Sequence, residues 1–176
     1  DDDYNINPDL IERAITKKTK AILPVHWSGR ICKMDKILKI SKKYDIPVVE
    51  DSCHAIEAKY KNKFAGTFGE FGCFSLHPLK NLNVWGDGGY VVIKNKKDYK
   101  NMLLMRNHGL IGRNKNLLFG YNSRLDTIQA VVANHLLKKI KKITSIRIKN
   151  SFYLEKKLKN IKYLNFKTRH KNLKEV

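Results

Sequence analysis

The sequence predicts an α/β fold in which helices cover a mainly parallel sheet. Short apolar runs, which are typical of buried strands, alternate along the chain with amphipathic stretches that are typical of helices. The 176 residues are enough for one domain with a real core. No internal repeat and no low-complexity linker interrupts this order.

The first part of the chain predicts two helices and two strands. Residues 7–16 predict a short helix, because Asn7 can cap it just before a proline. Residues 20–26 and 46–51 are brief apolar runs, hence strands, and the second run ends in two carboxylates. Residues 34–44 place their apolar side chains on one side and predict an amphipathic helix.

The middle of the chain predicts a turn, two more strands and a helix. A hairpin-like turn is expected at residues 61–63. Residues 72–77 and 88–95 are apolar runs next to glycines, and both predict strands. A helix over residues 96–109 can end at its terminal glycine.

The last part of the chain predicts two helices. Residues 123–143 predict a long amphipathic helix with Ser123 as its cap, and a second helix is expected over residues 147–160. Composition shifts near residue 143. We therefore predict a division into residues 1–143 and residues 144–176.

The formal net charge of +20 raises the question of a nucleic-acid partner. Most of the excess lies in residues 131–176, which carry 14 basic and 2 acidic side chains. A nucleic-acid binder would combine such charge with exposed aromatic side chains or a recognition helix. These lysines instead alternate with leucine and isoleucine at helical spacing, which favours a solvated helix face.

Several other classes are disfavoured by the sequence. No stretch approaches the about 18 consecutive apolar residues of a membrane span. Cys32, Cys53 and Cys73 form no CxxC pair, which is typical of free thiols in a reducing cytoplasm. The chain begins at Asp1 without an initiator methionine, so we expect it to be a piece of a longer protein.

The chemistry of the chain is expected beyond the carboxyl ends of the strands, where functional groups gather in open α/β sheets. One strand ends at His26, the next at Glu50 and Asp51 with a histidine three residues on, and a third leads to Ser75 and Lys80. A carboxylate after such an apolar run needs a cationic or proton-donating partner. A lysine shielded in a loop becomes a usable nucleophile.

An aspartate and a lysine from neighbouring strand ends are what pyridoxal phosphate needs. The lysine amine binds the aldehyde, and the aspartate keeps the pyridine nitrogen protonated. Many α/β proteins contain such a pair, so spacing alone leaves this hypothesis open. The nearby acidic, histidine and cysteine side chains lack recurrent ligand spacing, and no metal site is predicted. No nucleophile elbow and no dinucleotide fingerprint are present.

Five stretches in order carry a resemblance to a known family: "AILPVHWSGR", "VVEDSCHA", "GTFGEFGCFSLHPLKNLNVWGDGG", "RNHG" and "GYNSRLDTIQA". With them the chain resembles the DegT/DnrJ/EryC1/StrS family of sugar aminotransferases from about residue 1 to about residue 142. The resemblance implies a type I aminotransferase fold, with part of the large domain followed by the start of the small C-terminal domain. It also implies pyridoxal 5'-phosphate as cofactor and further chain upstream that holds a phosphate-binding turn and a ring-stacking aromatic.

The resemblance assigns roles to five residues. Lys80 matches the lysine that binds the cofactor covalently and shuttles a proton, and Asp51 matches the partner of the pyridine nitrogen. His54 matches a position that lies against the ring, and Ser75 matches a hydroxyl that binds the cofactor phosphate. Asn122 matches an asparagine that reaches the cofactor of the neighbouring subunit, which implies a homodimer with shared active sites.

Each of these residues also has a plain structural interpretation. Lys80 would be an ordinary surface lysine, Asp51 or Asn122 a helix cap, His54 a core histidine, and Ser75 a strand serine bonded to backbone. The family motif favours the cofactor roles over these alternatives.

The resemblance implies transfer of an amino group, usually from glutamate, to a keto-deoxysugar linked to a nucleotide. The pathway would be the synthesis of amino sugars or surface polysaccharides in the cytoplasm. One alternative is a sugar dehydratase of the same family, some of which carry histidine at the position of Lys80. Another is a basic regulatory protein that binds nucleic acid, for which we expect no sequence-specific binding.

Overall fold

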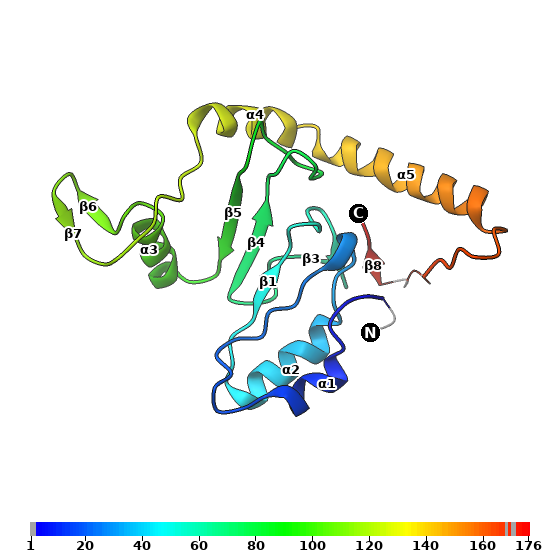
Figure 1. The fold of residues 1–176 in the computed structure, drawn as a ribbon, viewed down its shortest axis with the longest axis horizontal. Coiled ribbons are helices and arrows are strands. Elements are labelled where there is room, and N and C mark those ends of the chain that lie inside the picture. The colour runs from blue at the N-terminus through cyan, green and yellow to red at the C-terminus, as the bar shows by residue number, and fades with distance from the viewer. Residues whose placement is uncertain (1–2, 168, 170–171) are drawn as a thin grey trace.

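The computed structural model describes residues 3–167, 169 and 172–176. Its helices, shown in Figure 1, are α1 (Pro8–Ala14), the 3-10 turn η1 (Trp27–Gly29), α2 (Met34–Tyr44), α3 (Lys96–Met105), α4 (Thr127–Leu137) and α5 (Ile140–Leu158). Its strands are β1 (Val49–Asp51), β2 (Lys59–Tyr60), β3 (Lys63–Phe64), β4 (Phe71–Ser75), β5 (Gly89–Ile93), β6 (Leu110–Gly112), β7 (Lys115–Asn116) and β8 (Leu173–Lys174).

The central sheet has the strand order β1-β4-β5. β1 pairs with β4 in parallel, so that Asp51 lies opposite Cys73, and β5 closes the edge antiparallel to β4. The segment before η1 runs parallel to β1 through isolated bridges at Ile22 and Val25. This arrangement confirms the predicted α/β class.

The expected strand over residues 20–26 needs correction, because the segment makes two isolated bridges instead of a continuous ladder. The interruption has a simple cause. Pro24 lies between the two bridged positions and has no backbone N–H to donate.

A side-chain cap sets the start of the first N-terminal helix, and a left-handed residue sets the end of the second. The Asn7 side chain caps α1 by accepting a hydrogen bond from the backbone N–H of Asp9 at 3.0 Å. α2 ends at Asp45, which takes the left-handed conformation with a φ of 50°. Both helices confirm the sequence prediction, and α2 has the predicted bounds.

The main core lies between these helices and the parallel part of the sheet. The α2 residues Met34 and Ile37 are fully buried together with Val48 beside β1. A second cluster, Leu76, Leu82, Val84 and Ile140, packs the loop after β4 against the start of α5. This second cluster fixes the loop that carries Lys80.

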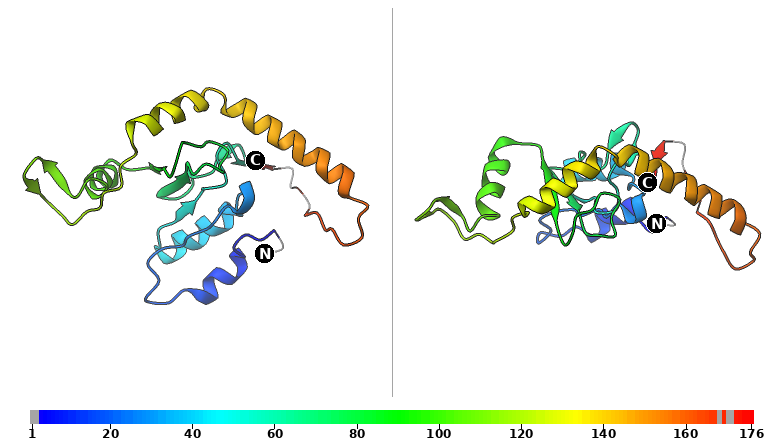
Figure 2. Two further views of the ribbon diagram at one scale, coloured as in Figure 1. Left: turned by 45° about the horizontal axis from the view of Figure 1, so that its top comes forward. Right: turned by 90° about the horizontal axis from the view of Figure 1, so that it is seen from above.

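The predicted hairpin turn is confirmed. β2 and β3 pair antiparallel across Lys61 and Asn62, whose φ angles of 47° and 64° are those of a tight primed turn. The last strand, β8, pairs with the other edge of β2. Figure 2 shows how the chain reverses after α5 to bring this C-terminal segment back beside the N-terminal half.

The predicted helix over residues 123–143 is wrong at both ends. α4 starts only at Thr127, because Asp126 and Gln129 form a reciprocal capping box. Ser123 lies before it in an extended segment and donates its backbone N–H to Arg106 at 2.9 Å. The chain then breaks after Leu137, and α5 runs on from Ile140 through residue 143. The proposed domain division at that residue stays a prediction.

Among the described residues, no helix is long and apolar enough to cross a membrane.

Candidate active site

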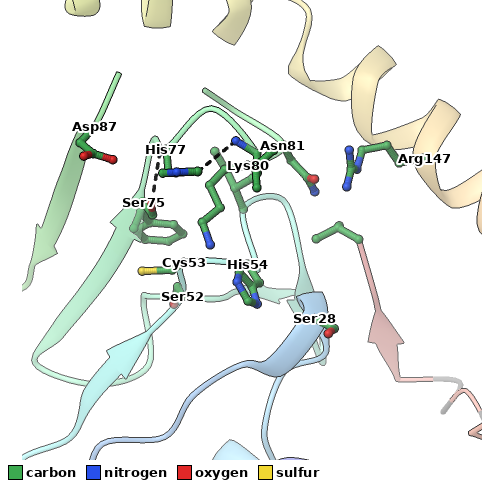
Figure 3. Close-up of a pocket in the computed structure, with 14 residues that line it drawn as sticks. Ser28, Ser52, Cys53, His54, Ser75, His77, Lys80, Asn81, Asp87 and Arg147 are labelled. Atoms are coloured by element: carbon green, nitrogen blue, oxygen red, sulfur yellow. Dashed lines mark hydrogen bonds between the residues drawn. The ribbon is translucent and has the colours of Figure 1, made fainter. Parts of the chain in front are cut away.

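A cavity of about 700 Å³ opens beyond the carboxyl ends of β1 and β4 (Figure 3). Three of the five residues singled out from the sequence line it, namely Lys80, His54 and Ser75. The other lining residues are Ser28, Ser52, Cys53, Ile56, Phe74, His77, Leu79, Asn81, Asp87, Arg147 and Val176. Asp51 and Asn122 are not among the residues that line the cavity.

The loop that carries Lys80 is anchored by backbone hydrogen bonds on both sides. Leu76 donates its N–H to Gly88 at 2.7 Å and accepts from the N–H of Val84 at 2.9 Å. Inside the loop, the N–H of Lys80 donates to the carbonyl of His77 at 2.9 Å. The Lys80 amine has no hydrogen-bond or ion-pair partner among the described residues, and Figure 3 shows it pointing into the cavity.

His77 shapes the same loop, a role that sequence reasoning left open. Its Nδ1 accepts a hydrogen bond from the N–H of Leu79 at 3.1 Å, and its own N–H donates to Ser75 Oγ at 3.2 Å. Because the Ser75 oxygen acts here as an acceptor, its hydroxyl proton remains available to donate to an anion in the cavity.

Asp51 ends β1 beside the cavity. Its backbone N–H donates to Pro24 at 2.9 Å, and its carbonyl accepts from His26 at 3.0 Å, which fixes the residue in the sheet. Its Oδ1 accepts the N–H of Cys53 at 3.0 Å. The Cys53 thiol also forms a hydrogen bond with the Asp51 carboxylate. A turn follows the strand instead of a helix, so Asp51 is not a helix cap.

His54 is exposed toward the cavity and is not a core histidine. Its ring lies 5.7 Å from the ring of Trp27, measured between centroids. Burial lowers the pKa of His54, and the positive charge of Lys80 lowers it further, against an opposing effect of Asp51. His54 is therefore a neutral ring at pH 7.

Asn122 lies apart from these residues. It is exposed, does not line the cavity, and accepts a hydrogen bond from Arg124 Nε at 3.1 Å. It is not the cap of α4, because Asp126 holds that position. Its expected reach into a neighbouring subunit stays a prediction.

Glu50, next to Asp51, forms a buried network that the sequence analysis did not assign. Its carboxylate accepts hydrogen bonds from the backbone N–H groups of Gly66, Phe68 and Gly69 at 2.8, 2.6 and 2.6 Å. It also pairs with His26 Nε2 at 2.9 Å, and neither side chain is exposed to solvent. The strand end is thus tied to the loop of residues 66–69.

The pKa of Glu50 reflects this network. Burial raises the pKa, but the hydrogen bond from His26 and those from the backbone of Gly69 and Gly66 outweigh it and hold the pKa below its ordinary value. His26 Nδ1 accepts a hydrogen bond from the N–H of Cys32 at 3.3 Å, so Nε2 carries the proton and donates the hydrogen bond to Glu50. The partner that a buried carboxylate needs at this strand end is His26.

Gly66 shows why the "GTFG" turn requires glycine. Its φ is 74°, and an added Cβ would lie 2.4 Å from the ring of Phe74, which lines the cavity.

The groups left without partners fit a cofactor with an aldehyde, a basic ring nitrogen and a phosphate. They are the Lys80 amine, the Ser75 hydroxyl proton and the buried hydroxyl of Ser52, which lines the cavity without a hydrogen-bond partner among the described residues. The Asp51 carboxylate, which bonds with Cys53, lies at the adjoining strand end. A buried polar group with no partner is uncommon and often marks a ligand site. Pyridoxal phosphate has the matching groups.

Comparison with known proteins decides the family. The chain matches the DegT/DnrJ/EryC1/StrS aminotransferase family over residues 1–176. The chain belongs to this family.

Relatives within the DegT/DnrJ/EryC1/StrS family include the UDP-N-acetyl-3-dehydro-alpha-D-glucosamine 3-aminotransferase of Acidithiobacillus ferrooxidans. It is 43% identical over 122 residues, which are 69% of this chain and 33% of that protein. The crystal structure of S. venezuelae DesV superposes with a TM-score of 0.92 at 29% identity and covers 97% of this chain and 46% of that one.

A third similar protein is the E. coli GDP-4-keto-6-deoxy-D-mannose-3-dehydratase, whose structure holds hydrated pyridoxal phosphate. It superposes with a TM-score of 0.85 at 30% identity and covers 94% of this chain and 47% of that one. The chain thus spans about a third of the curated relative and about half of each solved structure. These likenesses confirm the aminotransferase fold expected from the sequence.

Proposed function

We propose that the complete polypeptide that contains this chain is an aminotransferase dependent on pyridoxal phosphate. It moves an amino group from an amino acid, glutamate, to a ketone on a nucleotide-linked deoxysugar. The observation that carries the proposal is the convergence of Lys80, His54 and Ser75 on one cavity, with Asp51 at the adjoining strand end.

Four residues of this chain would hold the cofactor. Lys80 would bind its aldehyde, Asp51 its ring nitrogen through the carboxylate, and Ser75 its phosphate through the hydroxyl proton. The neutral ring of His54 would lie against the ring face. When bound, pyridoxal phosphate supplies a carrier for the amino group and a ring that delocalises electrons from the substrate carbon.

Lys80 has a second task in this proposal. Its amine, unpartnered and directed into the cavity, takes a proton from the substrate carbon and later returns one, as a general base and acid. The Asp51 carboxylate would hold the proton of the ring nitrogen.

The site is proposed to be completed in a homodimer in the cytoplasm, with Asn122 reaching the cofactor of the neighbouring subunit. The exposed position of Asn122 outside its own cavity supports this assignment. The product would enter amino-sugar or surface-polysaccharide synthesis.

A direct assay tests the reaction. The complete polypeptide, loaded with pyridoxal phosphate, is mixed with glutamate and a keto-deoxysugar nucleotide, and 2-oxoglutarate is measured. Formation of 2-oxoglutarate together with an amino sugar is expected. Absence of both with a panel of keto-sugar nucleotides would count against the reaction.

Sugar dehydration is the second candidate, favoured by the similarity to the E. coli dehydratase. Lys80 argues for transamination, because some dehydratases of the family carry histidine at this position. The same assay separates the two, since dehydration would consume the sugar nucleotide and yield no amino sugar.

A further inference from the structure

Arg147 on α5 is a cation at the cavity with no counter-charge. It lines the cavity together with Lys80, although the two residues are far apart in the sequence. Its side chain forms no ion pair or hydrogen bond with any residue that the structure describes. Figure 3 shows its guanidinium group directed from α5 toward the cavity and Asn81.

The other arginines near the C-terminal segment are neutralised. Arg30 pairs with Glu175 at 2.8 Å, and Arg169 pairs with both Glu155 and Glu175. These two glutamates are the only acidic residues in positions 131–176. No acidic side chain of that segment is therefore left for Arg147.

Arg147 also lies where two cavities meet. A second cavity of about 610 Å³ shares Ser28, Arg147 and Val176 with the first. A molecule longer than the cofactor could therefore extend from Lys80 past Arg147.

The charge of the first cavity points to an anion. The charged side chains that line it are Lys80, Arg147 and Asp87, and in Figure 3 Asp87 lies on the far side of the cavity from Arg147. In Figure 3, Lys80 lies between Ser75 and Arg147, so that Arg147 is on the opposite side of the lysine from the proposed phosphate ligand. The anion at Arg147 is thus separate from the cofactor phosphate.

We propose that Arg147 binds an oxyanion of the substrate and so determines which substrates the site accepts. A guanidinium group presents two parallel N–H donors that match a carboxylate or a phosphate. The amino donor carries carboxylates and the sugar nucleotide carries a diphosphate. This inference rests on the proposed function for the source of the oxyanion.

The two half-reactions of the complete enzyme distinguish these sources. Each is followed on its own by the absorbance change of the bound cofactor, with glutamate in one and the keto-sugar nucleotide in the other. Arg147→Gln is expected to lower kcat/KM roughly ten- to a hundredfold in the half-reaction whose substrate supplies the oxyanion. A loss with glutamate assigns the carboxylate, and a loss with the sugar assigns the diphosphate.

Two variants serve as controls. Arg147→Lys keeps the charge without the paired donors and should retain part of the activity. Lys149→Gln removes an exposed charge from the same helix outside the cavity, and both half-reactions should stay within about twofold of the wild type. The proposal would be overturned if Lys149→Gln lowered kcat/KM as much as Arg147→Gln does. It would also be overturned if Arg147→Gln changed kcat/KM by less than about threefold in both half-reactions.

A direct measurement of anion binding tests the role of Arg147 independently of the proposed reaction. Inorganic pyrophosphate and glutarate are titrated calorimetrically into the wild type and into Arg147→Gln. At least one probe should bind the wild type and bind the variant about tenfold more weakly, even if no transamination is found. Equal affinity of both probes for the two proteins would overturn the anion site, whatever the reaction proves to be.

Discussion

Single residues show how much of this site depends on groups that the chain itself leaves unsatisfied. The Asp51 carboxylate bonds with the backbone N–H and the thiol of Cys53 and has no cationic partner among the described residues. Ser75 accepts from the backbone and keeps its proton. Such half-satisfied groups are costly unless a ligand completes them.

Asp51→Asn tests the proposed ring partner. The amide keeps the shape and the bond to the Cys53 N–H but loses the charge that holds a proton on the ring nitrogen. Turnover should fall roughly a hundredfold while the cofactor stays bound. Steady-state kinetics with the absorbance of the bound cofactor checks this, and unchanged turnover would remove Asp51 from the role.

Cys53 should be an unreactive thiol despite lining the cavity. Burial and, after it, the hydrogen bond with Asp51 raise the pKa of the Cys53 thiol to about 12. Because the thiolate is the nucleophile, reactivity rises with pH, and alkylation at pH 8 should be roughly a thousandfold slower than for an ordinary thiol. Mass spectrometry after iodoacetamide treatment measures this, and a midpoint near pH 9 would contradict it.

At the scale of elements, the Glu50 network ties β1 to the loop before β4. Four hydrogen bonds converge on one buried carboxylate, one of them from His26 on the neighbouring segment. Since Asp51 follows directly in the chain, this network also fixes the proposed ring partner. We therefore expect the network to raise the free energy of unfolding.

His26→Ala should lower the free energy of unfolding by about 3–5 kcal/mol, because it leaves a buried charge short of its partner. His135→Ala, on the exposed face of α4, is the matched control and should cost no more than about 0.5 kcal/mol. Urea unfolding of the complete polypeptide measures both. Equal effects of the two substitutions would contradict a stabilising pair.

The pH dependence follows from the lowered pKa of Glu50. A carboxylate with a depressed folded pKa contributes stability that is complete above its unfolded pKa, here 4.5, and is lost as the pH falls below that value. The difference in the free energy of unfolding between the wild type and Glu50→Gln should therefore be largest near neutral pH and shrink in acid.

The elements also show where sequence reasoning succeeds and where it fails. Periodicity and capping predicted α1 and α2 because their signals are local. The start of α4 was missed, although the capping-box residues Asp126 and Gln129 mark it in the sequence. The break between α4 and α5 was missed as well. Arg147 could not be placed from sequence, because only the path of the chain through α5 brings it beside Lys80.

At the scale of the whole molecule, the charge is distributed as expected from the sequence. The lysines of α5 are exposed, which agrees with a solvated helix face: Lys141, Lys142, Lys149, Lys156 and Lys157. Large apolar side chains are also exposed on α4 and the loop before it, among them Phe119 and Ile128. Large exposed apolar areas mark surfaces that other protein covers, which is consistent with the proposed dimer.

Mixing two defective variants tests the shared active site. Lys80→Ala should be inactive, and Asn122→Ala should be weakened at limiting cofactor. In a mixed dimer, one site combines an intact Lys80 with an intact Asn122 from the other subunit. Activity should therefore recover when the variants are denatured and refolded together, and no recovery beyond the sum of the two would contradict a site shared between subunits.

The covalent attachment point of the cofactor tests the role of Lys80 most directly. The complete polypeptide is incubated with pyridoxal phosphate, reduced with borohydride, digested and analysed by mass spectrometry, with Lys80→Ala as control. A single pyridoxyl group is expected on Lys80, and it should disappear in the variant. A label on another lysine, or an unchanged label in Lys80→Ala, would contradict it.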